Sequence, residues 1–294
     1  MLTYQKCELC PRQCGVDRTN GERGFCQMPA QATAARASAH YWEEPVLSGA
    51  GGSGAVFFSG CTLRCAYCQN AEISRGGKGF SLTSDALRRT FLQLIDDGVQ
   101  NINLVTPTHF LPDILPALRP KLPVPIVYNC GGYERVETVR DLDGYVDVWL
   151  PDFKYSDGKL AAQLSAAPDY PGVAEAAICE MVQQVGPPVI RDGELVRGVM
   201  VRHLVLPGFV DNTLGVIDRL AALFPNGEIL FSLMRQYTPM GESAPLPDRR
   251  VTEEEYAAAL SWAELCGLTN GFAQDASAAE ADFIPAFDGS GLQF

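Results

Sequence analysis

Three cysteines within one eight-residue segment, directly after an apolar run, constrain what this chain can fold into more than any other feature. Cys61, Cys65 and Cys68 follow the run at residues 56–60 with the spacing C-x3-C-x2-C. Three thiolates this close together can bind one inorganic cluster, and they are one short of the usual four. The spacing favours a [4Fe–4S] cluster with one iron left open, in which these cysteines are both metal ligands and part of the catalyst.

Other interpretations of the three cysteines remain open at this point. They could form a zinc site, a disulfide with a spare thiol, or a set of buried side chains that only pack. Structural zinc normally takes four protein ligands, so three cysteines alone would leave that site incomplete.

The segment at residues 58–70, FSGCTLRCAYCQN, resembles the signature of the radical S-adenosylmethionine (SAM) superfamily. More narrowly it resembles the activating enzymes of pyruvate formate-lyase and related glycyl-radical enzymes, in a PflX-like branch. The resemblance implies that SAM chelates the open iron and that the reduced cluster splits it into methionine and a 5′-deoxyadenosyl radical, which takes a hydrogen atom from a substrate. Tyr67 lies where the family places an aromatic ring beside the adenine, although a ring that packs under the loop is an equal alternative.

Apolar runs alternate with helical patterns along most of the chain, which predicts an α/β fold with a parallel sheet. Strands are expected at residues 55–59, 101–106, 125–129, 146–151, 199–206 and 228–234, and helices at 84–97 and after the capping box at 252–255. Asp192-Gly193 predicts a hairpin within residues 188–197, and residues 268–273 predict an edge strand. Six strand–helix units, together with the resemblance, imply a partial (β/α)6 radical SAM barrel.

The chain divides into three predicted parts. Residues 1–48 form a small N-terminal cysteine-rich metal-binding segment, residues 49–274 the barrel, and residues 275–294 an extended C-terminal tail packed on it. The N-terminal segment holds Cys7, Cys10, Cys14 and Cys26, which are a full ligand set for zinc or for a second [4Fe–4S] cluster. Ligand count does not separate these two metal centres.

Polar residues directly after the predicted strands are candidates for binding the cofactor, because barrels of this type bind ligands at the carboxyl ends of their strands. They are Thr108, His109, Asn129, Asp152, Lys154, Arg202 and Gln236. Asp152 and Lys154 resemble the family's Asp-x-Lys element, and period-two spacing sends both side chains to one side. The alternative for them is a surface ion pair, which would contribute little.

Arg202 matches the family's arginine that contacts the SAM carboxylate, and a charge inside so apolar a strand needs a partner. The chain also departs from the family. It lacks the Gly-Gly-Glu turn that contacts the SAM amino group, which Thr108 and His109 would replace, although His109 could instead simply bond a backbone carbonyl. It also lacks a late histidine over the adenosine, whose place would fall to Gln236 or Tyr237.

Charge and cysteine usage limit the possible partners. The formal net charge of −12 makes nucleic-acid binding through phosphates an unfavourable interpretation. Residues 1–6 lack the apolar core of a secretory signal, and no run of about 18 apolar residues exists, so we expect a cytoplasmic protein that does not span a membrane. In a reducing compartment, ten cysteines indicate metal sites rather than disulfides.

The leading hypothesis is therefore a radical SAM enzyme that takes a hydrogen atom from a glycine of a glycyl-radical protein. Its partners would be SAM and a reductant such as flavodoxin or ferredoxin. A second form modifies a peptide, an RNA or a small metabolite. A hypothesis of another class is a non-catalytic Fe–S or zinc protein that transfers electrons or acts as a scaffold, which would need a fourth cluster ligand from Cys130, Cys179 or Cys266.

Overall fold

A curved, mainly parallel sheet organises the molecule in a computed structural model that describes residues 2–239, 246–274 and 285–294. The strands are β1 Ala32–His40, β2 Ser53–Phe58, β3 Phe80–Leu82, β4 Asn101–Val105, β5 Ile126–Cys130, β6 Val148–Pro151, β7 Val189–Arg191, β8 Glu194–Leu204, β9 Leu230–Met234 and β10 Gly271–Ala273. The sheet has the order β10-β9-β8-β6-β5-β4-β2-β1-β3, with β7 paired to β8. The six predicted core strands and the edge strand are confirmed, and all seven pair in parallel.

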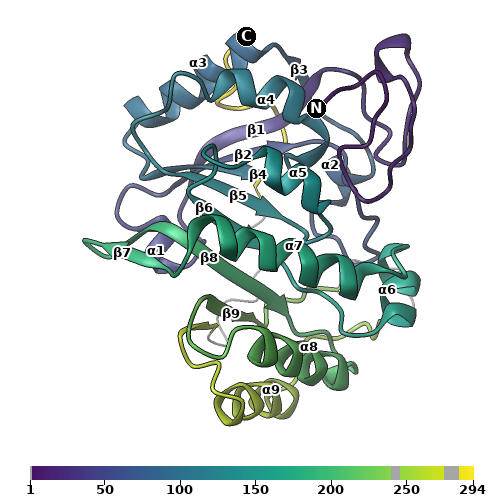
Figure 1. The fold of residues 1–294 in the computed structure, drawn as a ribbon, viewed down its shortest axis with the longest axis vertical. Helices are drawn as coiled ribbons and strands as arrows, with labels where there is room; N and C mark the ends of the chain where they lie inside the picture. The colour runs from purple at the N-terminus through teal and green to yellow at the C-terminus, as the bar shows by residue number, and fades with distance from the viewer. Residues whose placement is uncertain (1, 240–245, 275–284) are drawn as a thin grey trace.

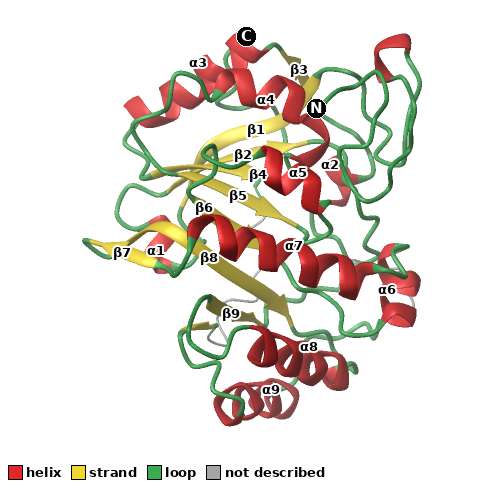
Figure 2. Ribbon diagram, viewed as in Figure 1, coloured by secondary structure: helices red, strands yellow, loops and turns green. Residues whose placement is uncertain are grey.

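The helices are α1 Pro45–Ser48, α2 Ala71–Ser74, α3 Ser84–Asp96, α4 Leu111–Ala117, α5 Val136–Asp141, α6 Gly158–Ser165, α7 Tyr170–Val185, α8 Val210–Leu223 and α9 Glu253–Leu265. The longer helices cover the outer face of the sheet (Figures 1 and 2), whereas Leu47 of α1 and Ile73 of α2 pack against its opposite face. The predicted capping box at the start of α9 is confirmed, because Thr252 accepts from the N–H of Glu255, whose carboxylate accepts from the N–H of Thr252. In the described part of the chain, no helix is both long and apolar enough to cross a bilayer.

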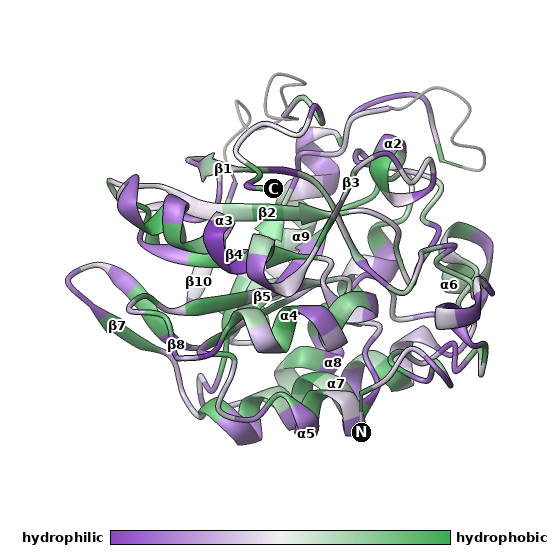
Figure 3. Cartoon of the chain, turned by 90° about the horizontal axis from the view of Figure 1, so that it is seen from above, coloured by the Kyte–Doolittle hydropathy of each residue, from purple (hydrophilic) through white to green (hydrophobic). Residues whose placement is uncertain are grey.

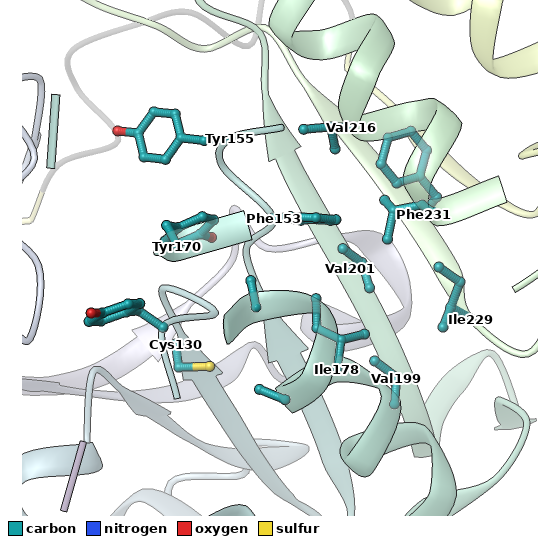
Figure 4. Close-up of a cluster of buried hydrophobic side chains, with 14 of the residues drawn as sticks. Cys130, Phe153, Tyr155, Tyr170, Ile178, Val199, Val201, Val216, Ile229 and Phe231 are labelled. Atoms are coloured by element: carbon teal, nitrogen blue, oxygen red, sulfur yellow. The ribbon is translucent and has the colours of Figure 1, made fainter. Parts of the chain in front are cut away.

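The core lies between the sheet and its helices. Figure 4 shows part of one buried cluster, to which Phe153, Tyr155, Tyr170, Ile178 of α7 and Phe231 of β9 belong. The middle strands are buried on both faces, and Figure 3 colours β2 and β5 mainly as hydrophobic. This double burial explains why their sequences read as continuous apolar runs.

The predicted hairpin is also confirmed. Asp192 and Gly193 both have positive φ values, 52° and 87°, between β7 and β8. Two positive φ values in a two-residue loop match the right-handed twist of the flanking strands, which is why Asp-Gly forms such turns.

Two antiparallel strands extend the sheet beyond β2, and neither was expected from the sequence. β1 pairs with β2, and β3 pairs with the start of β1. Residues 285–294 lie along the same edge, where the N–H of Ala37 donates to the carbonyl of Ser290 at 2.9 Å. The predicted tail residues 275–284 lie outside the described residues.

Candidate functional site

A cavity of about 450 Å³ opens at the carboxyl ends of the parallel strands. Its lining includes eight of the predicted site residues, which are Cys65, Tyr67, Cys68, Asn129, Asp152, Lys154, Arg202 and Gln236. Residues far apart in the chain therefore meet at one end of the sheet, as the strand-end argument predicts.

The loop at residues 61–68, here the cluster loop, leaves β2 through a glycine that no other residue could replace without rearrangement. Gly60 has φ +80°, and a Cβ there would lie 2.3 Å from Cγ of Met28. Beyond this turn, the Sγ of Cys65 accepts from Ser165 Oγ at 3.0 Å, and the Sγ of Cys61 accepts from the N–H of Leu63 at 3.3 Å. The loop is thereby held against α6 and the strand ends.

The three thiols of the cluster loop lie close together and are partly buried. Burial raises the pKa of Cys61, and the neighbouring thiols of Cys65 and Cys68 raise it further. Burial is also the largest cause of the raised pKa of Cys65. The positive charge of Lys154 acts to lower that pKa. A cluster that bound the three sulfurs would replace their protons and remove this repulsion, so the donor set fits an iron–sulfur cluster in its chemistry.

The arrangement of the side chains does not by itself identify a bound metal. Within the described residues, no group of three or more His, Cys, Asp or Glu side chains is arranged to hold a metal ion. The cysteine spacing and the family match reported below therefore carry the assignment of the cluster.

An ion pair between Asp152 and Lys154 lies on the wall next to the cluster loop, with both side chains about one-fifth exposed. Period-two spacing predicts that both side chains lie on one side, and the ion pair between them was the alternative to cofactor binding. The hydroxyl of Tyr170 accepts from the N–H of Lys154 at 2.9 Å and donates to the carbonyl of Gly131 at 2.8 Å, which fixes the backbone here. Burial acts to lower the pKa of Lys154, but the charges of Asp152 and Cys65 outweigh it and raise that pKa well above its ordinary value.

Arg202 has the charged partners that its buried position in β8 requires. Its Nε donates to Glu44 Oε1 at 2.9 Å, and its Nη2 forms ion pairs with Glu43 and Glu44. Burial opposes ionisation of Glu44, but the Arg202 guanidinium and a hydrogen bond from Ser232 hold the pKa of that carboxyl below its usual value. The same two carboxylates keep the pKa of Arg202 raised despite its burial.

Tyr67 and Gln236 connect the cluster loop to the rest of the cavity. The hydroxyls of Tyr67 and Tyr155 are 2.8 Å apart, and that of Tyr155 is 2.5 Å from Ser165 Oγ, which in turn bonds Cys65. Across the cavity, Gln69 donates to the carbonyl of Gln236 at 3.1 Å. Tyr67 is buried and also lines the cavity, so its ring is held in one place on the wall.

Thr108 and His109 do not line the cavity. Both are buried, and their side chains serve internal contacts. Thr108 donates to Glu134 at 2.9 Å, while the His109 Nε2 lies 2.7 Å from the Ser59 carbonyl. Burial lowers the pKa of His109 to about 4, so it is a neutral core histidine, which was the alternative left open by the sequence.

The four N-terminal cysteines lie near one another and beside the barrel. Cys7 and Cys10 are buried, and Cys14 and Cys26 are partly so. The raised pKa of Cys26 has burial as its largest cause, with the thiols of Cys7 and Cys14 adding to it. The segment is fastened to the cluster loop, because Nε of Arg12 donates to the carbonyl of Thr62 at 2.9 Å.

Sequence reasoning missed Glu43 and Glu44, which line the cavity from the segment between β1 and α1. Two acids directly before Pro45 look like an exposed helix start. The available signal was Arg202, whose buried charge demanded an acidic partner somewhere in the chain.

Comparisons with known proteins bear on both the loop and the fold. Residues 47–110, which contain the cluster loop, match the family model described as a 4Fe-4S single cluster domain. The chain resembles Streptococcus suis SuiB in complex with S-adenosylmethionine, with a TM-score of 0.55 and 13% identity, over 74% of this chain and 49% of SuiB. It also resembles a radical SAM methyltransferase from Sphaerobacter thermophilus, with a TM-score of 0.50 and 17% identity, over 75% of this chain and 65% of that one.

The structural matches show that the fold is the partial (β/α)6 barrel of radical SAM proteins, and the chain spans about half the length of SuiB. A Methanocaldococcus jannaschii protein, "Uncharacterized protein MJ0674", is 30% identical over 277 residues, which cover 90% of this chain and 76% of that protein. At that identity and coverage, the chain belongs to the same protein family as MJ0674.

Proposed function

We propose that the protein is a radical SAM enzyme that cleaves SAM reductively and uses the resulting radical to abstract hydrogen. The observation that supports this most strongly is that Cys65 and Cys68 line the same cavity as the Asp152–Lys154 pair. An iron–sulfur cluster on the loop and a zwitterionic ligand on the charged wall would then be neighbours. When bound, the cluster would supply the electron that splits the sulfonium.

The residues of the cavity take distinct roles in this proposal. Cys61, Cys65 and Cys68 hold the cluster, the Lys154 ammonium binds the SAM carboxylate, and Asp152 binds the SAM ammonium or the ribose hydroxyls. The bonds of Arg202 to Glu43 and Glu44 use Nε and Nη2, which leaves Nη1 for the ligand carboxylate. The remaining lining residues that would position the adenosine are Tyr67, Asn129 and Gln236.

The experiment is anaerobic reconstitution with iron, sulfide, dithionite and SAM, followed by chromatography for 5′-deoxyadenosine. We expect release by the wild-type protein and none by Cys65→Ser. The control is Cys179→Ser, which changes an exposed cysteine on α7 and should leave release unchanged. No release from protein with a confirmed cluster would refute the proposal.

Two substrates are consistent with this chemistry. A glycine of a glycyl-radical protein is the first, on the resemblance of the cluster loop to the activating enzymes. A peptide is the second, because SuiB, whose fold is similar, has been solved bound to the precursor peptide SuiA. Electron paramagnetic resonance of a co-encoded glycyl-radical protein separates them, since the first predicts a glycyl doublet and the second predicts none.

The four N-terminal cysteines are proposed to hold a second metal centre. Their mutual proximity supports this, and the segment's contact with the cluster loop would suit a structural or an electron-relay role. Metal analysis distinguishes the two, because about eight irons per chain indicate a second cluster and about four irons with one zinc indicate a structural site. The external electron donor would be a flavodoxin or ferredoxin.

A further inference from the structure

The negative and positive charges of the side chains that line the cavity do not balance. Among the described lining residues, Glu43, Glu44 and Asp152 face only two cations, Lys154 and Arg202. Burial is the main cause of the lowered pKa of His40, which also lines the cavity, so this ring is neutral at pH 7 and supplies no charge. Residues 240–245 and 275–284 contain no lysine, arginine or histidine that could supply one.

The excess negative charge is held in place by contacts that suit ionised carboxylates. Glu43 accepts from Asn103 Nδ2 at 2.9 Å and from Arg202, while Glu44 is held by Arg202. Their side chains are only 10% and 8% exposed. Because an enclosed, unmatched carboxylate is costly, such a site favours a ligand that brings a positive charge.

The bound cofactors would not remove this excess. A [4Fe–4S] core in its two-plus state with three thiolates carries one negative charge, and SAM carries one net positive charge, so the two cancel. A metal ion is also a poor candidate for the missing charge, because the Arg202 guanidinium already lies between the two carboxylates.

Aromatic rings line the cavity near the acidic pair. Trp42, which directly precedes Glu43, is 61% exposed and lines the cavity, and Phe57, whose ring centroid lies 6.2 Å from that of the cavity residue His40, lines it as well. Aromatic faces beside carboxylates form a good environment for an ammonium or guanidinium group, since the ring quadrupole attracts cations.

We infer that the substrate carries a basic amine or guanidinium group that binds between Glu43 and the aromatic wall formed by Trp42 and Phe57. The chemical fate of the bound substrate rests on the proposed function. The binding of its basic group does not. The basic group could belong to a free small molecule or to a residue of a peptide.

The test is isothermal titration calorimetry of the full-length, cluster-loaded protein with SAM present and no reductant. The probes are free arginine and a heptapeptide with one central arginine, each compared with its citrulline counterpart, which is nearly isosteric but neutral. We expect at least one arginine probe to bind about tenfold or more tightly than its citrulline counterpart. Binding of free arginine would indicate a small-molecule substrate, and binding of the arginine peptide alone a polypeptide.

The variant Glu43→Gln should abolish the preference for the charged probe. The matched control, Glu264→Gln, changes an exposed carboxylate on α9 and should keep it. Equal binding of both arginine probes and their citrulline counterparts, no binding of any cationic probe, or an unchanged preference in Glu43→Gln would each overturn the inference. Failure to release 5′-deoxyadenosine would refute the proposed function alone, because the titration requires no turnover.

Discussion

Glu134 is a fully buried carboxyl group that lies between the N-terminal segment and the strand ends. One oxygen accepts from Thr108, which in turn accepts from the Tyr128 hydroxyl at 3.1 Å. The other oxygen, Oε2, has no hydrogen-bond partner among the described residues. Burial raises the pKa of Glu134 to about 8, so the group is protonated in the folded protein at neutral pH.

This carboxyl predicts a loss of stability with rising pH. Because its folded pKa lies above the ordinary value, its contribution is complete at acidic pH and is lost as pH rises towards about 8. Glu134→Gln mimics the protonated form, so between pH 5.5 and 8.5 the wild type should lose about 3 kcal/mol more unfolding free energy than the variant. Urea denaturation at both pH values measures this, and parallel pH profiles would contradict it.

Lys154 carries a second prediction at the residue scale. Lys154→Gln removes the ammonium beside Cys65 and Asp152, so the Kd for SAM should rise about tenfold or more. Lys159→Gln is the control, because Lys159 is an exposed lysine in α6. Equilibrium dialysis with labelled SAM gives both values, and equal affinities in the two variants would exclude Lys154 as a ligand.

At the scale of elements, the N-terminal segment and the cluster loop are joined through Phe25. The Arg12 guanidinium lies 3.8 Å from the ring centroid of Phe25, and that of Arg64 lies 4.6 Å from it. Arg64 also donates to the Phe25 carbonyl at 2.9 Å. Because Phe25 precedes Cys26, we expect folding of the cysteine segment to order the cluster loop.

Phe25→Ala should therefore loosen the cluster loop without unfolding the sheet. Loss of two cation–π contacts should speed amide exchange of Leu63 and Ala66 about tenfold, while β4 and β5 stay protected. Hydrogen exchange with mass spectrometry makes the comparison, with Phe294→Ala at an exposed ring as the control. Unchanged exchange in the loop would mean that Phe25 does not couple the two segments.

The elements also show what the sequence could and could not predict. The doubly buried parallel strands were visible as apolar runs, because burial on both faces permits few polar residues. β1 was missed because its sequence, ATAARASAH, is rich in alanine, which has little strand propensity. The segment is a strand because it pairs with β2. The Arg202–Glu44 contact joins residues 158 positions apart, and such a pairing leaves no local pattern.

At the scale of the whole molecule, the C-terminal end of the chain lies along β1. The N–H of Gly289 donates to the carbonyl of Ala35 at 2.8 Å, and Leu292 is buried with α3 and the N-terminal residues Tyr4 and Leu9. Phe287 contacts the cavity residue Phe57, with ring centroids 5.6 Å apart. The last ten residues therefore support both the sheet edge and one wall of the cavity.

Deletion of residues 285–294 should lower the Tm by several degrees, because it exposes the edge of β1 and removes the buried Phe287 and Leu292. Scanning calorimetry of the cluster-free protein measures the shift. A deletion of only Gln293 and Phe294 is the control, since it keeps the buried side chains of Phe287 and Leu292. Equal Tm values for the two truncations would contradict this account of the edge.

The central claim is that SAM binds the open iron of a cluster held by Cys61, Cys65 and Cys68. Electron–nuclear double resonance of the reduced protein with SAM labelled with ¹⁵N at its amino group tests it most directly, in a Cys7→Ser/Cys10→Ser background that removes the proposed second metal centre. The account predicts a nitrogen hyperfine coupling to the cluster that disappears in Cys65→Ser. A cluster signal that is unchanged by SAM, with no nitrogen coupling, would contradict it.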